Sequence, residues 1–171
     1  MVPESTPEKT AQGLVPRGDG WFVLGLREAT WRHAHGRGAV CVAIDNFEGE
    51  RRPVQLALNP FVLMPGEPMA QYHWEADQED FLIVSGQATL IIEGEERALQ
   101  AWDLVHCPPR VPHTIVGPGL VLAVGARKEK GSARYPVEPA AIRHDAGVRS
   151  DDEAPYERFP PPAIGPAPPL T

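Results

Sequence analysis

Residues 66–86 read GEPMAQYHWEADQEDFLIVSG, and this stretch decides the kind of fold that the chain adopts. Its centre holds three side chains of types that bind metal ions, His73, Glu75 and Glu79. An apolar run, Phe81–Val84, follows and ends at Gly86. Alternate residues of a β-strand point to the same face of a sheet. The stretch therefore predicts extended chain in which donor side chains gather beside an apolar strand.

Short apolar runs with turn residues between them continue on both sides of this stretch. Such runs, rich in Val, Ile, Leu and Phe, are typical of an all-β sandwich or barrel. Glycine-containing turns are expected at residues 85–87, 93–95 and 117–119. The expected strands are Ala39–Asp45, Val54–Met64, Met69–Trp74, Asp80–Ser85, Ala88–Glu93, Leu104–Cys107, His113–Val116 and Leu120–Ala126.

A second stretch, residues 102–113, reads WDLVHCPPRVPH. Together the two stretches resemble the paired motifs of the cupin superfamily. The first motif has a glycine, then His-x-His, and ends in a glutamate followed by a glycine, an ending that Glu79 and Gly86 fit. Pro108 and His113 match the second motif. The departures from the second motif are Trp102, Arg110 and Gly117, which replace Gly, Gly and Asn.

The resemblance implies an all-β fold, a cupin-type double-stranded β-helix or jelly-roll barrel, over residues 39–126. An N-terminal arm with an edge strand is expected over residues 1–38, and a C-terminal extension over 127–171. Within the extension, Glu138–His144 predicts a short helix, because an acid and a proline precede a basic end. Residues 159–169 are rich in proline, which lacks the N–H and fixes φ, so an extended tail is expected there.

The His-x-His of the first motif is altered here, and two registers are open. In the first, His73 and Glu75 take the two His positions, with three residues between Glu75 and Glu79. In the second, Tyr72 and Trp74 take those positions, every spacing is kept, and His73 points away. A slip of one residue turns every side chain to the other face. We favour the first register because it leaves a workable set of metal ligands.

The favoured register predicts a metal site where the two motifs meet. Imidazole and carboxylate donors suit a divalent ion such as Fe, Mn, Ni or Zn, with positions open for substrate or water. Glu79 is also the candidate catalytic residue, as a ligand or as a base. The predicted ligands are His73, Glu75, Glu79 and His113, and the predicted substrate-pocket residues are Tyr72, Trp74, Phe81 and His106.

Two classes of function fit this site. The first is a metal-dependent enzyme of the dioxygenase or isomerase type that acts on a small molecule. The second is a non-catalytic module that binds or senses a small ligand. The altered His-x-His favours this second class. A labile or redox-active metal with an open position would favour the enzyme.

Composition limits the partners and the compartment. The 171-residue chain has a net charge of −7, which argues against nucleic acid and anionic membrane surfaces as partners. No apolar run approaches the ~20 residues that span a bilayer. Without a visible signal peptide, and with two cysteines, a cytoplasmic location is expected. The apolar segment Trp21–Leu24 favours pairing with a neighbouring chain, so a symmetric homodimer is expected.

Overall fold

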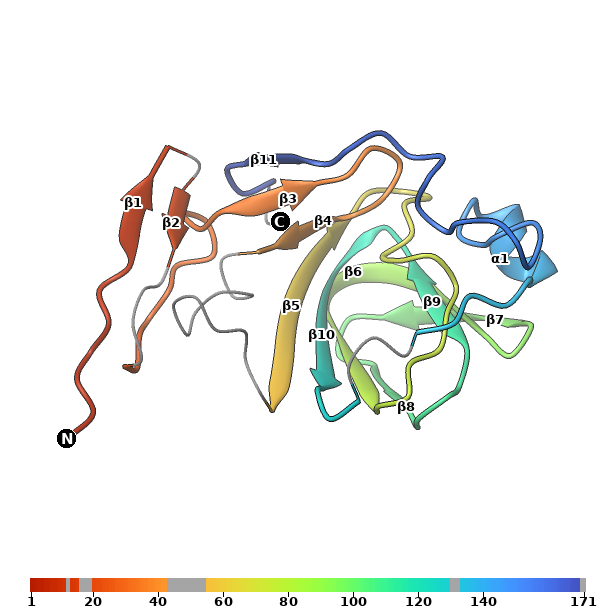
Figure 1. Ribbon diagram of the computed structural model, residues 1–171, viewed down its shortest axis with the longest axis horizontal. Helices are drawn as coiled ribbons and strands as arrows, with labels where there is room; N and C mark the ends of the chain where they lie inside the picture. Colours follow the sequence, from red (N-terminus) through yellow and green to blue (C-terminus); the bar gives the residue numbers. More distant parts are fainter. Residues whose placement is uncertain (12, 16–19, 43–54, 130–132, 170–171) are drawn as a thin grey trace.

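Strands dominate the computed structural model, which describes residues 1–171 apart from 12, 16–19, 43–54, 130–132 and 170–171 (Figure 1). Paired strands run antiparallel, and the described residues include one short helix, so the all-β fold is confirmed. No helix among them has the length and apolarity needed to cross a membrane. The strands are β1 (Glu8–Thr10), β2 (Gly13–Val15), β3 (Trp31–His33), β4 (Ala39–Cys41), β5 (Leu56–Leu63), β6 (Glu79–Ile92), β7 (Glu95–Gln100), β8 (Leu104–Cys107), β9 (His113–Val116), β10 (Gly119–Ala126) and β11 (Ala163–Gly165).

The long strand β6 organises the barrel, because its two halves have different partners (Figure 1). The first half, Glu79–Gly86, pairs with β10, and Glu79–Leu82 also pairs with β8. The second half, Gln87–Ile92, pairs with β7, and Thr89–Ile92 also pairs with β9. One strand therefore belongs to both walls of the barrel.

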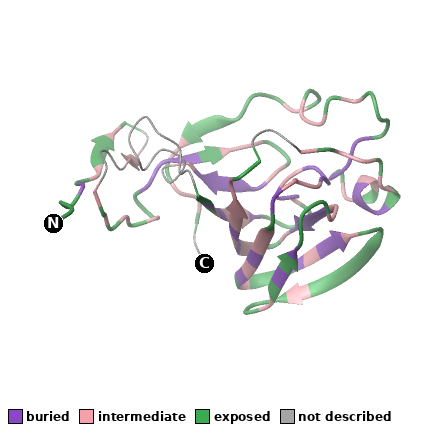
Figure 2. Ribbon diagram, turned by 60° about the horizontal axis from the view of Figure 1, so that its bottom comes forward, coloured by how far each residue is buried: buried purple, intermediate pink, exposed green. Residues whose placement is uncertain are grey.

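Apolar side chains at alternate positions along the strands fill the interior between these walls. In Figure 2, buried bands alternate with partly exposed ones along the barrel strands, whereas β7 is almost entirely exposed. Burial of each large apolar side chain stabilises the fold by roughly 1.5–3 kcal/mol. The large members of the core are Leu63, Met69, Phe81, Ile83, Leu90, Val105, Ile115 and Val121.

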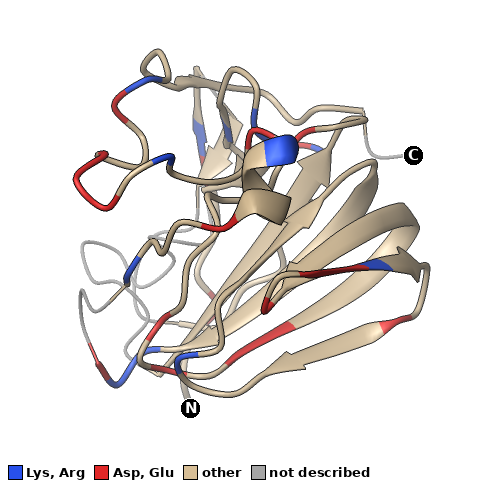
Figure 3. Cartoon of the chain, turned by 90° about the vertical axis from the view of Figure 1, so that its right-hand side faces the viewer, with Lys and Arg blue, Asp and Glu red and all other residues tan. Residues whose placement is uncertain are grey.

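Further strands extend the barrel wall on one side. Beyond β10, the order is β5, β4, β3 and β11, while β1 and β2 form a separate hairpin. A second apolar cluster around Trp31, with Ala29, Ala39 and Cys41, holds β3 and β4 together. Most charged residues lie on loops, at strand ends and on β7 (Figure 3). Among the described residues, the buried polar side chains include a group near the start of β6, with His73, Asp77 and His113.

The turn expected at residues 85–87 is wrong, because β6 continues through Gly86. Gly86 has a φ of +79°, a left-handed conformation that costs other residues about 1–2 kcal/mol. A Cβ at this position would also lie 3.0 Å from the Cα of Gly119. The glycine marks the point where β6 passes from one wall to the other. The expected turns at 93–95 and 117–119 do separate strands.

Other differences concern short or polar segments. The expected strand Met69–Trp74 is irregular chain held by isolated bridges at His73 and Trp74. Strands β3, β7 and β11 do not follow from the apolar runs, since β7 is polar and the other two have three residues each. Residues 43–45 and 54, expected in two strands, lie outside the described residues.

The expected C-terminal helix is confirmed as α1 (Pro139–Arg143). The Glu138 carboxylate caps it by accepting the Ala140 N–H at 3.0 Å. After α1, residues 144–165, which we call the C-terminal strap, run back across the barrel toward β3 (Figure 1). The Pro-rich tail, expected to be extended, includes β11, which pairs with β3 at the edge of the sheet. An edge strand bonds on one side only, so it tolerates neighbouring prolines.

Candidate metal centre

An antiparallel bridge joins the two motif stretches at their histidines. The His113 N–H donates to the His73 carbonyl at 2.8 Å, and the His73 N–H donates to the His113 carbonyl at 3.2 Å. Trp74 and Arg134 exchange the same pair of bonds on the outer side. The chain is therefore extended around His73, so His73 and Glu75 share a face and Trp74 points away. This arrangement is the first of the two registers.

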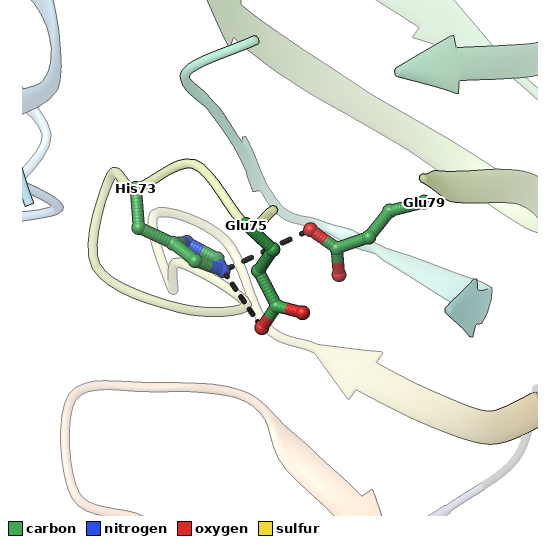
Figure 4. Close-up of side chains that lie close together, drawn as sticks. All are labelled: His73, Glu75 and Glu79. Atoms are coloured by element: carbon green, nitrogen blue, oxygen red, sulfur yellow. Dashed lines mark ion pairs between the residues drawn. The ribbon is translucent and has the colours of Figure 1, made fainter. Parts of the chain in front are cut away.

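His73, Glu75 and Glu79 point toward one another (Figure 4). Nε2 of His73 lies 3.8 Å from Oε1 of Glu75 and 3.9 Å from Oε2 of Glu79. One donor atom from each of the three residues lies within 4.8 Å of the others. His113 is the fourth residue of the group, and its Nε2 lies 3.4 Å from Oε2 of Glu79. The structure thus brings the four predicted ligands to one place.

Both imidazoles are fixed so that Nε2 faces the carboxylates. Nδ1 of His73 is 2.8 Å from the Gln71 carbonyl, and Nδ1 of His113 is 2.9 Å from the Val111 carbonyl. A carbonyl oxygen only accepts hydrogen bonds, so each Nδ1 carries a proton and donates it. In the neutral imidazole, Nε2 then carries the lone pair that binds a metal ion, whereas an additional proton on the ring occupies Nε2.

Two buried atoms of this group have no hydrogen-bond partner within the described part of the chain. They are Oε2 of Glu79 and Nε2 of His113. A buried polar atom left unpaired costs about 1–3 kcal/mol. A cation between the two atoms would satisfy both, so the donor set fits a divalent metal ion. The side chain of His113 is 2% exposed and that of Glu75 is 41% exposed, so the group faces solvent at Glu75.

The charges at the site attract a cation. The imidazole of His73 lowers the pKa of Glu75 and keeps that carboxylate ionised. Burial by itself lowers the pKa of His113, but Cys107 and Glu79 beside it outweigh burial and raise that pKa to about 10. Without a metal the site therefore holds a proton on His113, and a metal ion that binds there must displace it.

Neighbouring polar residues have other tasks. Asp77 accepts the N–H groups of Lys128 and Glu129, each at 2.7 Å, and so fixes the chain after β10. Asp80 and His106 face each other across β6 and β8 with 2.6 Å between Oδ1 and Nδ1. Because alternate residues of β6 point to opposite faces, Asp80 and His106 lie on the side away from Glu79.

The four predicted pocket residues have different surroundings. Phe81 lies against His113, with ring centroids 5.0 Å apart. Tyr72 packs in the cluster that holds α1. Trp74 lines a separate hollow of about 570 Å³. His106 faces outward with Asp80.

Tyr135 is a neighbour of the site that the sequence does not reveal. Its ring stacks on His73, with centroids 5.6 Å apart and planes inclined by 23°. Burial, followed by Tyr156 and the charges of Glu75 and Glu79, raises the pKa of Tyr135, so its phenol stays protonated. No spacing relates residue 135 to either motif, and only the folded chain brings it to His73.

Residues 60–124 match the model described as "Cupin domain". This segment contains His73, Glu75, Glu79 and His113. No curated protein sequence matches the chain.

Several solved structures are similar to part of this chain. Streptomyces PAC13, solved with uridine, is 16% identical, with a TM-score of 0.52 over 66% of this chain and 88% of its own. A putative sugar phosphate isomerase from Acidithiobacillus ferrooxidans is 24% identical, with a TM-score of 0.41 over 43% of this chain and 51% of its own. The DMSP lyase DddQ from Ruegeria pomeroyi is 22% identical, with a TM-score of 0.46 over 57% of this chain and 50% of its own. This chain therefore spans about half the length of the latter two proteins.

The family match coincides with the barrel around β6 and with the two motif stretches. Residues 60–124 therefore form a cupin domain within this chain.

Proposed function

We propose that the chain is a metal-dependent enzyme that acts on a small molecule and holds one divalent ion with His73, Glu75, Glu79 and His113. The observation that carries the proposal is the pair of buried, unpartnered atoms, Oε2 of Glu79 and Nε2 of His113. The closeness of His73, Glu75 and Glu79 supports it independently. Two imidazoles and two carboxylates suit Fe, Mn, Ni or Zn.

The residues of the chain prepare the site for that ion. A bound ion would supply Lewis-acid polarisation of a substrate oxygen. The rings of Phe81 and Tyr135 lie against the two imidazoles and limit the access of water. Glu75, the most exposed of the group, marks the side from which a substrate reaches it.

Glu79 has one of two roles, and a single variant separates them. As a ligand, its Oε2 bonds the metal directly. As a general base, the same unpartnered oxygen accepts a proton from the substrate. In Glu79→Gln the amide oxygen is a poor ligand and accepts no proton at neutral pH. Loss of metal from this variant assigns Glu79 as a ligand, and retained metal with lost turnover assigns it as the base.

The reaction is of the isomerase or the dioxygenase type. An isomerase moves a proton between two atoms of the substrate, and the second carboxylate and the protonated phenol of Tyr135 support this version. A dioxygenase requires a redox-active ion such as Fe. Oxygen uptake and proton exchange from D₂O, each measured over a panel of small ketones, enols and sugars, distinguish the two.

Elemental analysis tests the proposal most directly. Protein purified without added metal should contain about one first-row divalent ion per chain, as expected of a mononuclear site. Dialysis against a chelator should remove the ion, and added ion should restore it. Chains that contain no metal and take up none from solution at micromolar concentrations would refute the proposal.

A non-catalytic binding module is the second candidate. One observation favours it: a carboxylate, Glu75, stands where the first motif has its second imidazole. Such a module would bind a small ligand and return it unchanged. Stoichiometric binding of a compound from the same panel, with neither oxygen uptake nor proton exchange, would assign the chain to this class.

A further inference from the structure

Arg37 is a half-buried cation without a carboxylate partner in the described residues. It lies in the turn between β3 and β4, far from the metal group in sequence. Its Nε is buried and has no hydrogen-bond partner within the same residues. Burial lowers the pKa of this guanidinium, a sign that its charge has lost part of its hydration. Desolvating a charge that is not neutralised is costly, so an Arg kept in this state calls for an explanation.

Two aromatic rings of the C-terminal strap enclose the guanidinium. The central carbon of Arg37, Cζ, lies 4.6 Å from the ring centre of Tyr156 and 5.0 Å from that of Phe159. Contacts of this kind hold the guanidinium plane in place through cation–π attraction. They leave its N–H groups free to donate, because an aromatic face uses none of them in the plane of the guanidinium.

Arg158 provides an internal comparison, because it lies against the same ring of Phe159, at 5.0 Å. Its N–H groups reach the Glu153 carboxylate, the Gln71 side chain and two strap carbonyls. The charge and donors of Arg158 are thus used within the protein, and they hold the strap in place. No equivalent acceptors surround Arg37 in the described residues.

A continuous line of rings connects Arg37 to the metal group. Tyr156 meets Tyr135 edge to face, with centroids 5.8 Å apart, and Tyr135 stacks on His73. Arg37 therefore lies one ring beyond the residues that flank the metal ligands.

We propose that Arg37 binds an oxyanion of the substrate, a carboxylate or a phosphate, while the reacting end of the same molecule lies at His73, Glu75 and Glu79. This inference rests on the proposed function of that site. The guanidinium fork donates two parallel hydrogen bonds to such groups. The chain carries a net charge of −7, and Glu75 and Glu79 repel anions further, so an anionic substrate needs a dedicated cation in the protein.

The test uses the full chain loaded with Mn²⁺ and, separately, the metal-free chain. Binding of inorganic phosphate and of succinate is measured by titration calorimetry, and metal content by elemental analysis. Arg37→Gln should retain metal occupancy and bind the preferred anion at least about tenfold more weakly, as expected for the loss of charge-assisted hydrogen bonds. Arg37→Lys, which keeps the charge but not the fork, should fall between the two. A loss confined to phosphate indicates a phosphate ester, and one confined to succinate a carboxylic acid.

Two control variants separate recognition from other effects. Arg32→Gln removes a neighbouring exposed charge and should leave anion binding unchanged. Arg158→Gln disturbs the strap and should lower thermal stability more than Arg37→Gln does. Anion affinity that is equal in wild type and both Arg37 variants overturns the inference, as does an equal loss in Arg32→Gln. Failure of Mn²⁺ to bind counts against the proposed function alone, because dependence of anion binding on Arg37 is still measured in the metal-free chain.

Discussion

His73 is the side chain on which the metal proposal depends most, because its Nε2 faces both carboxylates of the first motif. We predict that His73→Ala lowers metal affinity at least about tenfold, as is typical when a group that holds a metal is removed. His113→Ala should be at least as damaging, because it removes the ligand contributed by the other motif. Elemental analysis after equilibrium dialysis measures both.

His106→Ala is the matched control for these variants. It also removes an imidazole, but one that pairs with Asp80 outside the metal group. Metal occupancy should therefore match that of the wild type. Equal metal loss in His106→Ala and His73→Ala would contradict the site.

Gly86 and Gly66 allow the cost of a left-handed backbone conformation to be separated from the cost of a steric clash. Both have a φ of +79°, but a Cβ at Gly86 would meet Gly119 at 3.0 Å, whereas nothing lies within 4 Å at Gly66. We predict that Gly66→Ala lowers the free energy of unfolding by about 1 kcal/mol, the cost of the left-handed conformation alone. Gly86→Ala should cost at least about 1 kcal/mol more, because β6 and β10 must move apart.

Urea denaturation measures both glycine variants. Equal destabilisation by the two substitutions would show that β10 moves without cost to accommodate a methyl group at residue 86.

Side chains of the metal group were within reach of sequence reasoning, whereas those around it were not. His73, Glu75 and Glu79 are close in sequence, and their spacing on extended chain predicts a common face. Tyr135 and Arg37 come from distant segments and are brought to the group by the strap and by the β3–β4 turn. No local sequence pattern indicates that these two residues lie near the group. The face shared by His73, Glu75 and Glu79 could therefore be predicted from the sequence, whereas the positions of Tyr135 and Arg37 could not.

Strands with apolar alternation were predictable for a similar reason. Strands β8, β9 and β10 each bury alternate or continuous apolar residues, and their expected bounds agree closely with the structure. The edge strand β7 carries charged residues that discourage pairing with other chains, so its sequence resembles a loop. Strand β3 pairs with both β4 and β11, and its pairing with β11 joins segments far apart in the chain.

Pairing of β11 with β3 changes the expectation for the tail. We predict that removal of residues 163–171 lowers the Tm by about 3–6 °C. The truncation removes the hydrogen bonds between β11 and β3 and exposes β3, which together should cost roughly 1–2 kcal/mol of stability. Ala167 also packs against the cluster around Trp31 and would be lost. Differential scanning calorimetry measures the change.

Removal of residues 170–171 alone is the control for this truncation and should leave the Tm unchanged. If the longer truncation were equally silent, β11 would contribute nothing to the stability of the fold.

The surface of the molecule exposes several large apolar side chains. Trp102 and Leu104 are 80% and 70% exposed beside β8, and Val23 in the N-terminal arm is 77% exposed. We predict a symmetric homodimer that covers at least one of these two surfaces. Light scattering should give twice the mass of the chain at micromolar concentration.

Two charge substitutions then identify the surface that is covered. Leu104→Glu should yield monomers if the second copy covers β8, and Val23→Glu if it covers the arm. A wild-type chain that is monomeric at these concentrations would contradict the prediction.

Because β6 pairs with strands of both barrel walls, its two halves are expected to form at different stages of folding. Its second half forms a tight hairpin with β7, a contact between neighbours in sequence that closes within microseconds in isolated hairpins. Its first half needs β10, which in turn pairs with β5 from the far side of both motifs. Closing such long loops carries an entropic cost that slows folding. We therefore expect the end of β6 that bears Glu79 to be ordered later than its second half, so that His73, Glu75, Glu79 and His113 come together on a hairpin that has already formed.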